Sequence, residues 1–177
     1  MAVPLRPVLS TPREPSLIPG VLIIAGGRGV LLEGPSGAGK SDAAVALLDR
    51  GHTLVADDAV RLHRDGDRLL GGCPEDGRGL LHLRDLGVIE VTRLYPGAFR
   101  PWAEIGLCLR LQPEPGASEA EGLLQGRRDD RWLLGIRLPR ITLTDSAQRP
   151  LAPLIEAAAG QPDRPAEPAG TASRGTG

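Results

Sequence analysis

Residues 30–41 read Val30-Leu31-Leu32-Glu33-Gly34-Pro35-Ser36-Gly37-Ala38-Gly39-Lys40-Ser41. Positions 34–41 match the pattern G-x-x-x-x-G-K-[ST] of a phosphate-binding loop, and they follow an apolar run that predicts a buried strand. The glycines of such a loop let successive backbone N–H groups turn toward one anion, and the helix that follows directs its positive end at the same anion. Because residues 41–50 have a helical pattern, we interpret the motif as a nucleotide phosphate site rather than as a chance glycine-rich turn.

Two side chains of this loop carry specific chemistry. Lys40 is the only lysine of the 177-residue chain, and it stands where a compact ammonium group is required and a planar guanidinium would not fit. We expect Lys40 to reach the β and γ phosphates of ATP, and the hydroxyl of Ser41 to complete the ligand shell of Mg²⁺. The residues predicted to bind ATP are therefore Gly34, Pro35, Ser36, Gly37, Ala38, Gly39, Lys40 and Ser41.

A pair of carboxylates follows the loop and its helix. The run Leu54-Val55-Ala56-Asp57-Asp58 places both acids at the end of a short buried strand, and in a parallel sheet this end lies beside the phosphate loop. One carboxylate could hold Mg²⁺, and the other could accept a proton from an attacking hydroxyl group. We favour this interpretation over an ordinary acidic turn because the phosphate-binding motif stands upstream.

The composition excludes several classes of protein. A net charge of −1 provides no basic excess, so we expect no nucleic-acid partner. No apolar run approaches the ~20 residues of a membrane helix, and prolines interrupt the N-terminal region in which a signal peptide would lie. The chain has only two cysteines, which fits a reducing compartment. We therefore expect a cytoplasmic protein with no membrane partner.

The sequence divides into three parts. Residues 1–16 are rich in proline and predict a loose arm, residues 17–160 form the folded core, and residues 161–177 predict a disordered tail because they contain too little apolar surface to offset the entropy of ordering. Inside the core, strand patterns and helix patterns predict an α/β fold with a mixed sheet. The predicted strands cover residues 21–25, 30–32, 54–56, 60–63, 87–94, 105–111 and 133–143, and the predicted helices residues 41–50 and 151–159.

One segment of the core predicts a loop. Residues 112–131 mix proline, glycine and charged side chains, a composition typical of loops. The charged cluster Arg127–Arg131 closes this segment, and we expect it to be a solvated part of the loop; a role in docking an acidic partner stays open.

The sequence resembles the catalytic domain of HPr kinase/phosphorylase. The most specific part of the resemblance is the phosphate loop followed by Val55-Ala56-Asp57-Asp58, and it extends over the whole core, through residues 49–60, 83–89, 138–143 and 154–158. The resemblance implies a P-loop kinase core of the kind found in phosphoenolpyruvate carboxykinase, assembled as a homohexamer. It also implies a short form without the N-terminal domain that full-length members carry.

The resemblance implies an ATP- and Mg²⁺-dependent protein-serine kinase that acts on HPr, the phosphocarrier protein of the sugar phosphotransferase system. Many members also remove the phosphate by phosphorolysis, in which phosphate attacks and pyrophosphate leaves. By position, Asp57 would be the general base, Asp58 would support the metal, and Lys40 would contact the phosphates. Arg84 matches the arginine of the signature Glu-x-Arg-Gly-Leu-Gly, and Arg149 matches an arginine linked to phosphorolysis that is usually contributed at a subunit interface.

Three positions depart from the family pattern. His82 replaces the opening glutamate of the signature, Asp85 replaces its first glycine, and Pro19 replaces a histidine that usually precedes the first Gly-Val-Leu strand. We interpret His82, a single histidine beside leucines, as a packed or surface residue rather than as a metal ligand. The departures leave the phosphorylase activity open. They also leave open a nonenzymatic nucleotide-sensing regulator of the phosphotransferase system and, as a third possibility, a small-molecule P-loop kinase.

Overall fold

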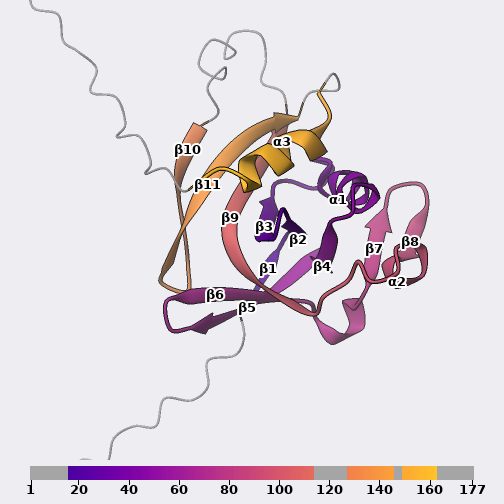
Figure 1. Ribbon diagram of the computed structural model, residues 1–177, viewed down its shortest axis with the longest axis horizontal. Helices are drawn as coiled ribbons and strands as arrows, with labels where there is room; N and C mark the ends of the chain where they lie inside the picture. Colours follow the sequence, from indigo (N-terminus) through magenta and orange to yellow (C-terminus); the bar gives the residue numbers. More distant parts are fainter. Residues whose placement is uncertain (1–15, 114–126, 146–148, 163–177) are drawn as a thin grey trace, which may run out of the picture.

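Strand β3 (Arg28–Glu33), which leads into the phosphate loop, lies inside a nine-stranded sheet (Figure 1). The computed structural model describes residues 16–113, 127–145 and 149–162. The strand order is β1-β5-β6-β9-β3-β2-β4, and β11 joins the sheet through β9 and carries β10. The other strands of this sheet are β1 (Ser16–Pro19), β2 (Val21–Ala25), β4 (Thr53–Ala56), β5 (Ala59–Asp65), β6 (Arg68–Gly72), β9 (Trp102–Pro113), β10 (Arg127–Leu133) and β11 (Ile136–Asp145).

The strand directions bring two sequence motifs to one edge of the sheet. β3 runs parallel to β9, and β9 runs parallel to β11. β2 lies between β3 and β4 and is antiparallel to both, so β4 runs in the same direction as β3. The carboxyl ends of β3 and β4 therefore share an edge, although the two strands are not neighbours. The predicted mixed α/β sheet is confirmed.

The central strands β2 and β3 are buried on both faces of the sheet. Helices α1 (Lys40–Asp49) and α3 (Leu151–Ala159) pack on one face against a cluster that contains Val30 and Leu32 of β3. Leu31, between them, belongs to a second cluster on the other face, which the β5–β6 hairpin and the β10–β11 hairpin cover. Successive side chains of a strand point to opposite faces, so burial on both sides explains why β2 and β3 read as continuous apolar runs.

An ion-pair cluster joins α3 to the segment that follows α1. Glu156 of α3 accepts hydrogen bonds from Nε and Nη2 of Arg50 at 2.7 and 2.6 Å, and its Oε1 lies 2.7 Å from Nε2 of His52. Both partners follow α1 directly, at the turn into β4. These contacts hold the pKa of Glu156 far below its usual range, at about 2, chiefly because of the hydrogen bond with Arg50.

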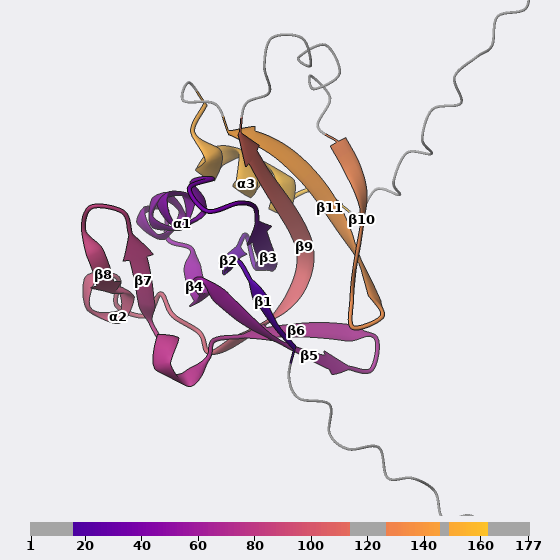
Figure 2. The ribbon, with the colours of Figure 1, turned by 180° about the vertical axis from the view of Figure 1, so that it is seen from behind.

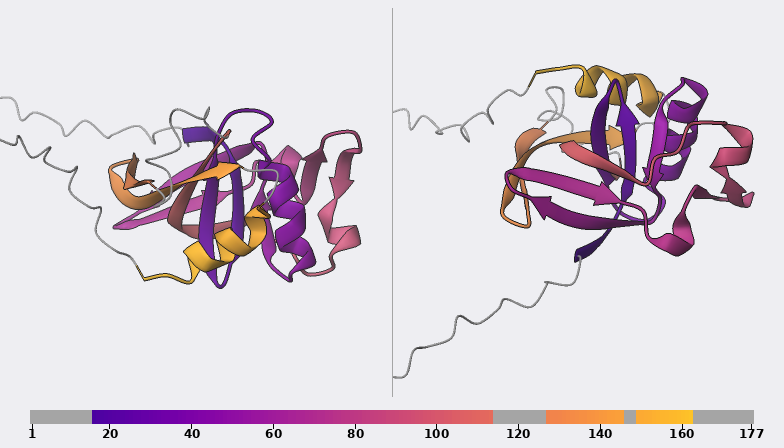
Figure 3. Two further views of the ribbon diagram at one scale, coloured as in Figure 1. Left: turned by 90° about the horizontal axis from the view of Figure 1, so that it is seen from above. Right: turned by 60° about the horizontal axis from the view of Figure 1, so that its bottom comes forward.

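A small second sheet lies on the other side of α1 (Figures 2 and 3). It consists of β7 (Leu80–Leu83) and β8 (Gly87–Glu90), followed by the short helix α2 (Val91–Leu94), and a 3₁₀ turn (Glu75–Gly77) precedes it. Leu81 of β7 and Val91 of α2 are fully buried in the cluster beneath α1. The small sheet is therefore anchored to the core of the domain.

Several predicted elements are corrected by the structure. Residues Arg127–Arg131 are not a loop but most of β10, where Asp129 pairs with Arg140 and Asp130 pairs with Arg137 across the β10–β11 ladder. The strand predicted over 87–94 ends at Glu90 and is followed by α2. The strand at 60–63 extends over Ala59–Asp65 and lies between β1 and β6.

The remaining parts of the predicted organisation fall mainly on residues outside the described ranges. These are residues 1–15 of the predicted arm, residues 163–177 of the predicted tail and residues 114–126 of the predicted loop excursion. Ser16, the last residue of the predicted arm, is the first residue of β1. In the described part of the chain, no helix has the length and apolar character needed to cross a membrane.

Candidate active site

The phosphate loop connects the carboxyl end of β3 to the first turn of α1, as the motif predicts. Gly37 and Gly39 have φ values of 81° and 79°, and Gly34 has a φ of 149°, conformations that glycine adopts without a β-carbon clash. Gly34 also packs against the carbonyl oxygen of Leu111 at the end of β9, where there is no room for a β-carbon. α1 begins at Lys40, so the free N–H groups of its first turn face the loop.

The side chain of Lys40 folds back over the loop. Its Nζ donates hydrogen bonds to the carbonyl oxygens of Gly34 and Pro35, each at 2.9 Å. An ammonium group has three donors, so one remains for an anion while these two fix the position of the charge. Lys40 therefore lies over the loop, and its contact with the β and γ phosphates stays a prediction.

Asp57 lies at the carboxyl end of β4 and contacts the loop helix. Its Oδ1 accepts a hydrogen bond from the hydroxyl of Ser41 at 3.2 Å, and its Oδ2 accepts one from the backbone N–H of His82 at 2.7 Å. The side chain is 2% exposed. Burial raises the pKa of Asp57 above its ordinary value, although the hydrogen bonds from His82 and Ser41 act in the opposite direction.

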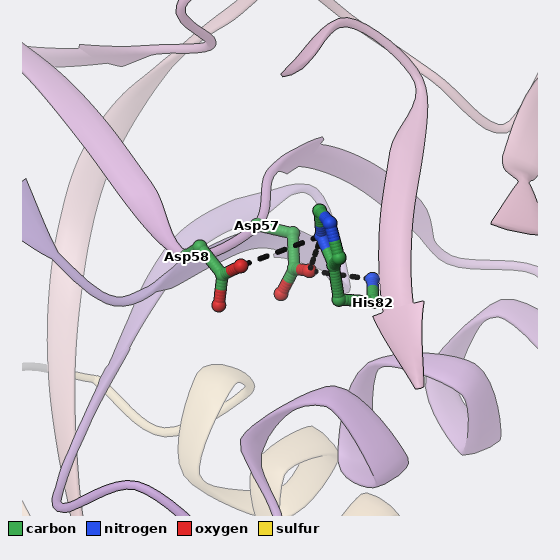
Figure 4. A group of neighbouring side chains, drawn as sticks. All are labelled: Asp57, Asp58 and His82. Carbon is green, nitrogen blue, oxygen red and sulfur yellow. Dashed lines mark hydrogen bonds and ion pairs between the residues drawn. The ribbon is translucent and has the colours of Figure 1, made fainter. Parts of the chain in front are cut away.

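Asp58 points to the same region as Asp57 because the backbone turns between them. Adjacent strand residues normally face opposite sides, but Asp58 has a φ of 61°, in the left-handed region. Its carboxylate is exposed, and its Oδ2 lies 3.3 Å from Nδ1 of His82, while Oδ2 of Asp57 lies 3.5 Å from the same nitrogen. Figure 4 shows the two carboxylates on one side of the imidazole ring.

These three side chains form a possible metal site. In the described ranges they are the one group of three acidic, histidine or cysteine side chains whose ligand atoms come together, all within 4.8 Å of one another. Two carboxylates suit a divalent cation, and imidazole is a common metal ligand. The donor set therefore fits the Mg²⁺ position predicted beside Ser41.

The loop, Asp58 and His82 line one open pocket of about 260 Å³, whereas the buried Asp57 is not among its lining residues. Arg84 also lines it, and its Nη2 lies 3.0 Å from the position that a β-carbon on Gly37 would take, so the guanidinium group sits over the glycine of the loop. Arg149 precedes α3 and is exposed, and it is not among the residues that line the pocket. The lining residues are Ser36, Gly37, Gly39, Lys40, Ser41, Asp42, Asp58, His82 and Arg84.

His82 is the residue of this pocket that sequence reasoning set aside. Its side chain is 55% exposed, which agrees with the predicted surface position. The part of the surface on which it lies is the wall of the pocket. On β7 Leu81 is buried and His82 is exposed, but the leucines on both sides of His82 show no alternation from which this could be predicted. A side chain two positions from Arg84 is expected on the same face.

Comparison with known proteins shows the family to which this chain belongs. Residues 13–167 match the family model described as "HPr Serine kinase C-terminal domain". The chain belongs to this family. Among curated HPr kinase/phosphorylases it is 40% identical to that of Halalkalibacterium halodurans over 144 residues and 36% identical to that of Azoarcus sp. over 141 residues. These matches cover 79% and 78% of this chain, but 46% and 45% of the relatives.

A solved structure of the HPr kinase family has the same fold. The Hpr(Ser) kinase/phosphatase from Coxiella burnetii superposes with a TM-score of 0.72 at 29% identity, over 80% of this chain and 87% of that one. The chain spans about half the length of the curated relatives it matches. The resemblance recognised in the sequence is therefore confirmed at the level of the HPr kinase C-terminal domain.

The structure accommodates two of the departures from the family signature. Asp85 has a φ of 67° in the turn between β7 and β8, a conformation that suits glycine and that aspartate tolerates better than most residues. Pro19 ends β1 opposite Ala59 of β5. Neither residue lines the pocket.

Proposed function

We propose that this chain is an ATP- and Mg²⁺-dependent protein-serine kinase whose substrate is HPr. The observation that carries the proposal is the contact between Ser41 of the phosphate loop and Asp57, at 3.2 Å. It joins a phosphate-binding element to a buried carboxylate at the same edge of the sheet. A kinase needs both within one site, since phosphoryl transfer depends on positioning and on charge stabilisation.

Asp57 has the properties of a general base. Its burial raises its pKa, and a carboxylate of raised basicity accepts a proton from a hydroxyl group more readily than an exposed one. Hydrogen bonds from Ser41 and from the His82 backbone fix its orientation. We infer that Asp57 takes the proton of the substrate serine as the serine oxygen attacks the γ-phosphorus of ATP and ADP leaves, and that it returns a proton when the reaction runs in reverse.

Other residues bind the phosphates and hold their charge. Lys40 and the backbone N–H groups of residues 34–41 would contact the β and γ phosphates. Arg84, above Gly37, would stabilise the negative charge on the transferring group. Ser41 and Asp58 would hold Mg²⁺, which would supply positive charge to offset the negative charge of the phosphates.

The reverse reaction belongs to the same proposal. The curated relatives are named HPr kinase/phosphorylase, and phosphorolysis would use the same base in its protonated form. Arg149, exposed beside α3, would act from a neighbouring subunit of a hexamer.

We further propose that residues 17–160 are the catalytic unit, supported by the span from β1 to α3, and that the protein works in the cytoplasm with HPr.

The direct experiment incubates the protein with its cognate HPr, ATP and Mg²⁺ and searches for phosphoserine by mass spectrometry. The expected result is one phosphoserine that requires all three components and is lost in Lys40→Ala. A screen of small metabolites with labelled ATP runs in parallel. Phosphate transfer to a metabolite, or nucleotide binding with no transfer to any cognate HPr, would overturn the proposal.

A further inference from the structure

His82 contributes two separate groups to the pocket. Its backbone N–H donates to Oδ2 of Asp57, which fixes β7 against the end of β4. Its imidazole ring extends past this contact into the pocket, with Nδ1 3.5 Å from Asp57 and 3.3 Å from Asp58 (Figure 4). The position of the ring thus depends on the backbone of β7, which Leu81 anchors in the core.

The surroundings of Nδ1 favour a cation. Asp57 and Asp58 together carry two negative charges when ionised, and each carboxylate oxygen can accept more than one contact. Oδ2 of Asp57 is bound to the His82 backbone and Oδ1 to Ser41, whereas the carboxylate of Asp58 is 70% exposed. The positive groups of the same pocket are Lys40, which is bound to loop carbonyls, and Arg84, which lies over Gly37.

The chemistry of the ring distinguishes between divalent ions. Mg²⁺ prefers an octahedron of oxygen ligands, including several waters. Mn²⁺, Co²⁺ and Zn²⁺ accept imidazole nitrogen more readily, and their affinity for nitrogen ligands exceeds that of Mg²⁺. A site in which an imidazole nitrogen joins the carboxylate of Asp58 therefore selects differently from a site made of oxygen atoms alone.

We propose that Nδ1 of His82 is a direct ligand of the divalent ion that accompanies the nucleotide, together with Asp58, and that this nitrogen shifts the preference of the site from Mg²⁺ toward Mn²⁺ and similar transition metals. The inference rests on the proposed nucleotide site, and it adds a ligand and a metal preference to it. The same three side chains would otherwise form only a hydrogen-bonded ion pair between the ring and the two acids.

Pulsed electron paramagnetic resonance on bound Mn²⁺ separates these two arrangements. The protein is loaded with Mn²⁺ and a nonhydrolysable ATP analogue, and modulation from a directly bonded nitrogen is recorded. Selective ¹⁵N labelling of histidine distinguishes protein nitrogen from nucleotide nitrogen. The expected spectrum contains one histidine nitrogen, and this coupling disappears in His82→Ala.

The matched control is His63→Ala. His63 is an exposed histidine on β5 and does not line the pocket, so its removal leaves the coupling unchanged. A wild-type spectrum without histidine nitrogen, or a coupling that survives in His82→Ala, overturns the proposal. The labelled wild-type spectrum decides the question even if His82→Ala fails to fold.

Metal competition provides a second readout. His82→Glu replaces the nitrogen by a carboxylate oxygen, and we expect it to lower the ratio of Mn²⁺ affinity to Mg²⁺ affinity by about tenfold or more, the scale on which ligand surroundings control metal binding. An unchanged ratio contradicts the proposal. Neither measurement requires HPr, so histidine coupling without phosphoserine formation refutes the kinase proposal alone, and phosphoserine formation without coupling refutes the metal proposal alone.

Discussion

Gly34 is the position at which the phosphate loop depends most directly on the rest of the fold. Its φ of 149° is rarely adopted by residues with a side chain, and a β-carbon there would approach the carbonyl oxygen of Leu111 to less than 3.0 Å and its carbonyl carbon to 3.3 Å. These atoms are backbone atoms of β9 and cannot rotate away. Gly34→Ala therefore forces either the loop or the strand to move.

The cost of Gly34→Ala can be compared with that of a matched glycine. Gly66 also has a positive φ, 60°, but a β-carbon there would meet nothing within 4 Å, so Gly66→Ala costs only the left-handed backbone, about 1 kcal/mol. Gly34→Ala adds backbone strain of about 1–3 kcal/mol to overpacking of about 1–3 kcal/mol. The expected loss in the free energy of unfolding is thus several times that of the control.

Urea unfolding followed by far-ultraviolet circular dichroism measures the free energy of unfolding of both variants. Titration with nucleotide measures their ATP affinity. Gly34→Ala is expected to lose ATP affinity by at least about tenfold, because a displaced loop misaligns its N–H groups, and Gly66→Ala is expected to retain it. Equal unfolding free energies for the two variants, with ATP affinity retained in both, would refute the close contact of Gly34 with the backbone of Leu111 on β9.

Three further predictions concern the surroundings of the site. Asp85→Gly should raise the free energy of unfolding by roughly 0.5–1 kcal/mol, because φ is 67° at this exposed turn, and a lower midpoint in urea would contradict this. Leu81→Ala should lower it by ~2–5 kcal/mol because the side chain is fully buried; a loss below that range would show that β7 is not anchored there. The hydrogen bonds from Arg50 and His52 lower the pKa of Glu156 from its ordinary value of 4.5 to about 2, so its ion pairs stabilise the fold above pH 4.5 and this contribution disappears as the pH falls toward 2. Thermal unfolding of Glu156→Gln should therefore approach the wild type over that range, and a constant difference would argue against the ion-pair cluster.

The strand, loop and helix around Lys40 could be predicted because their pattern is local. The motif, the apolar run before it and the helical spacing after it all lie within residues 30–50. The meeting of Asp57 with Ser41 was also predictable, although the reason differs from the one the sequence suggested. β4 is not adjacent to β3 but is separated from it by the antiparallel strand β2, and it still ends at the same edge.

Strands whose composition is atypical could not be predicted. The charges of Arg127–Arg131 are typical of a solvated loop when taken alone, but in β10 they pair with residues of β11 that lie across the ladder. β6 contains Gly71 and Gly72, which weaken a strand pattern. The structure gives the reason for both glycines, since a β-carbon at Gly71 would strike Leu22 and one at Gly72 would strike Trp102.

The place of His82 in the pocket could not be predicted for a similar reason. A histidine among leucines gives no sign of what lies opposite, and the acids that face it are 24 and 25 positions earlier in the chain. They come together only because β7 packs beside α1 and because Asp58 adopts a φ of 61°. Neither feature can be predicted from the spacing of apolar residues within a short stretch of sequence.

The central claim is that Asp57 accepts a proton from a serine of HPr beside the loop that holds ATP. The measurement that tests it most directly is the single-turnover rate of HPr phosphorylation by wild type, Asp57→Asn and the control Asp67→Asn, an exposed residue of the β5–β6 turn. We predict that Asp57→Asn is slower by ~10²–10⁴-fold with ATP affinity retained, and that Asp67→Asn matches the wild type. A rate for Asp57→Asn within a few-fold of wild type would contradict the account.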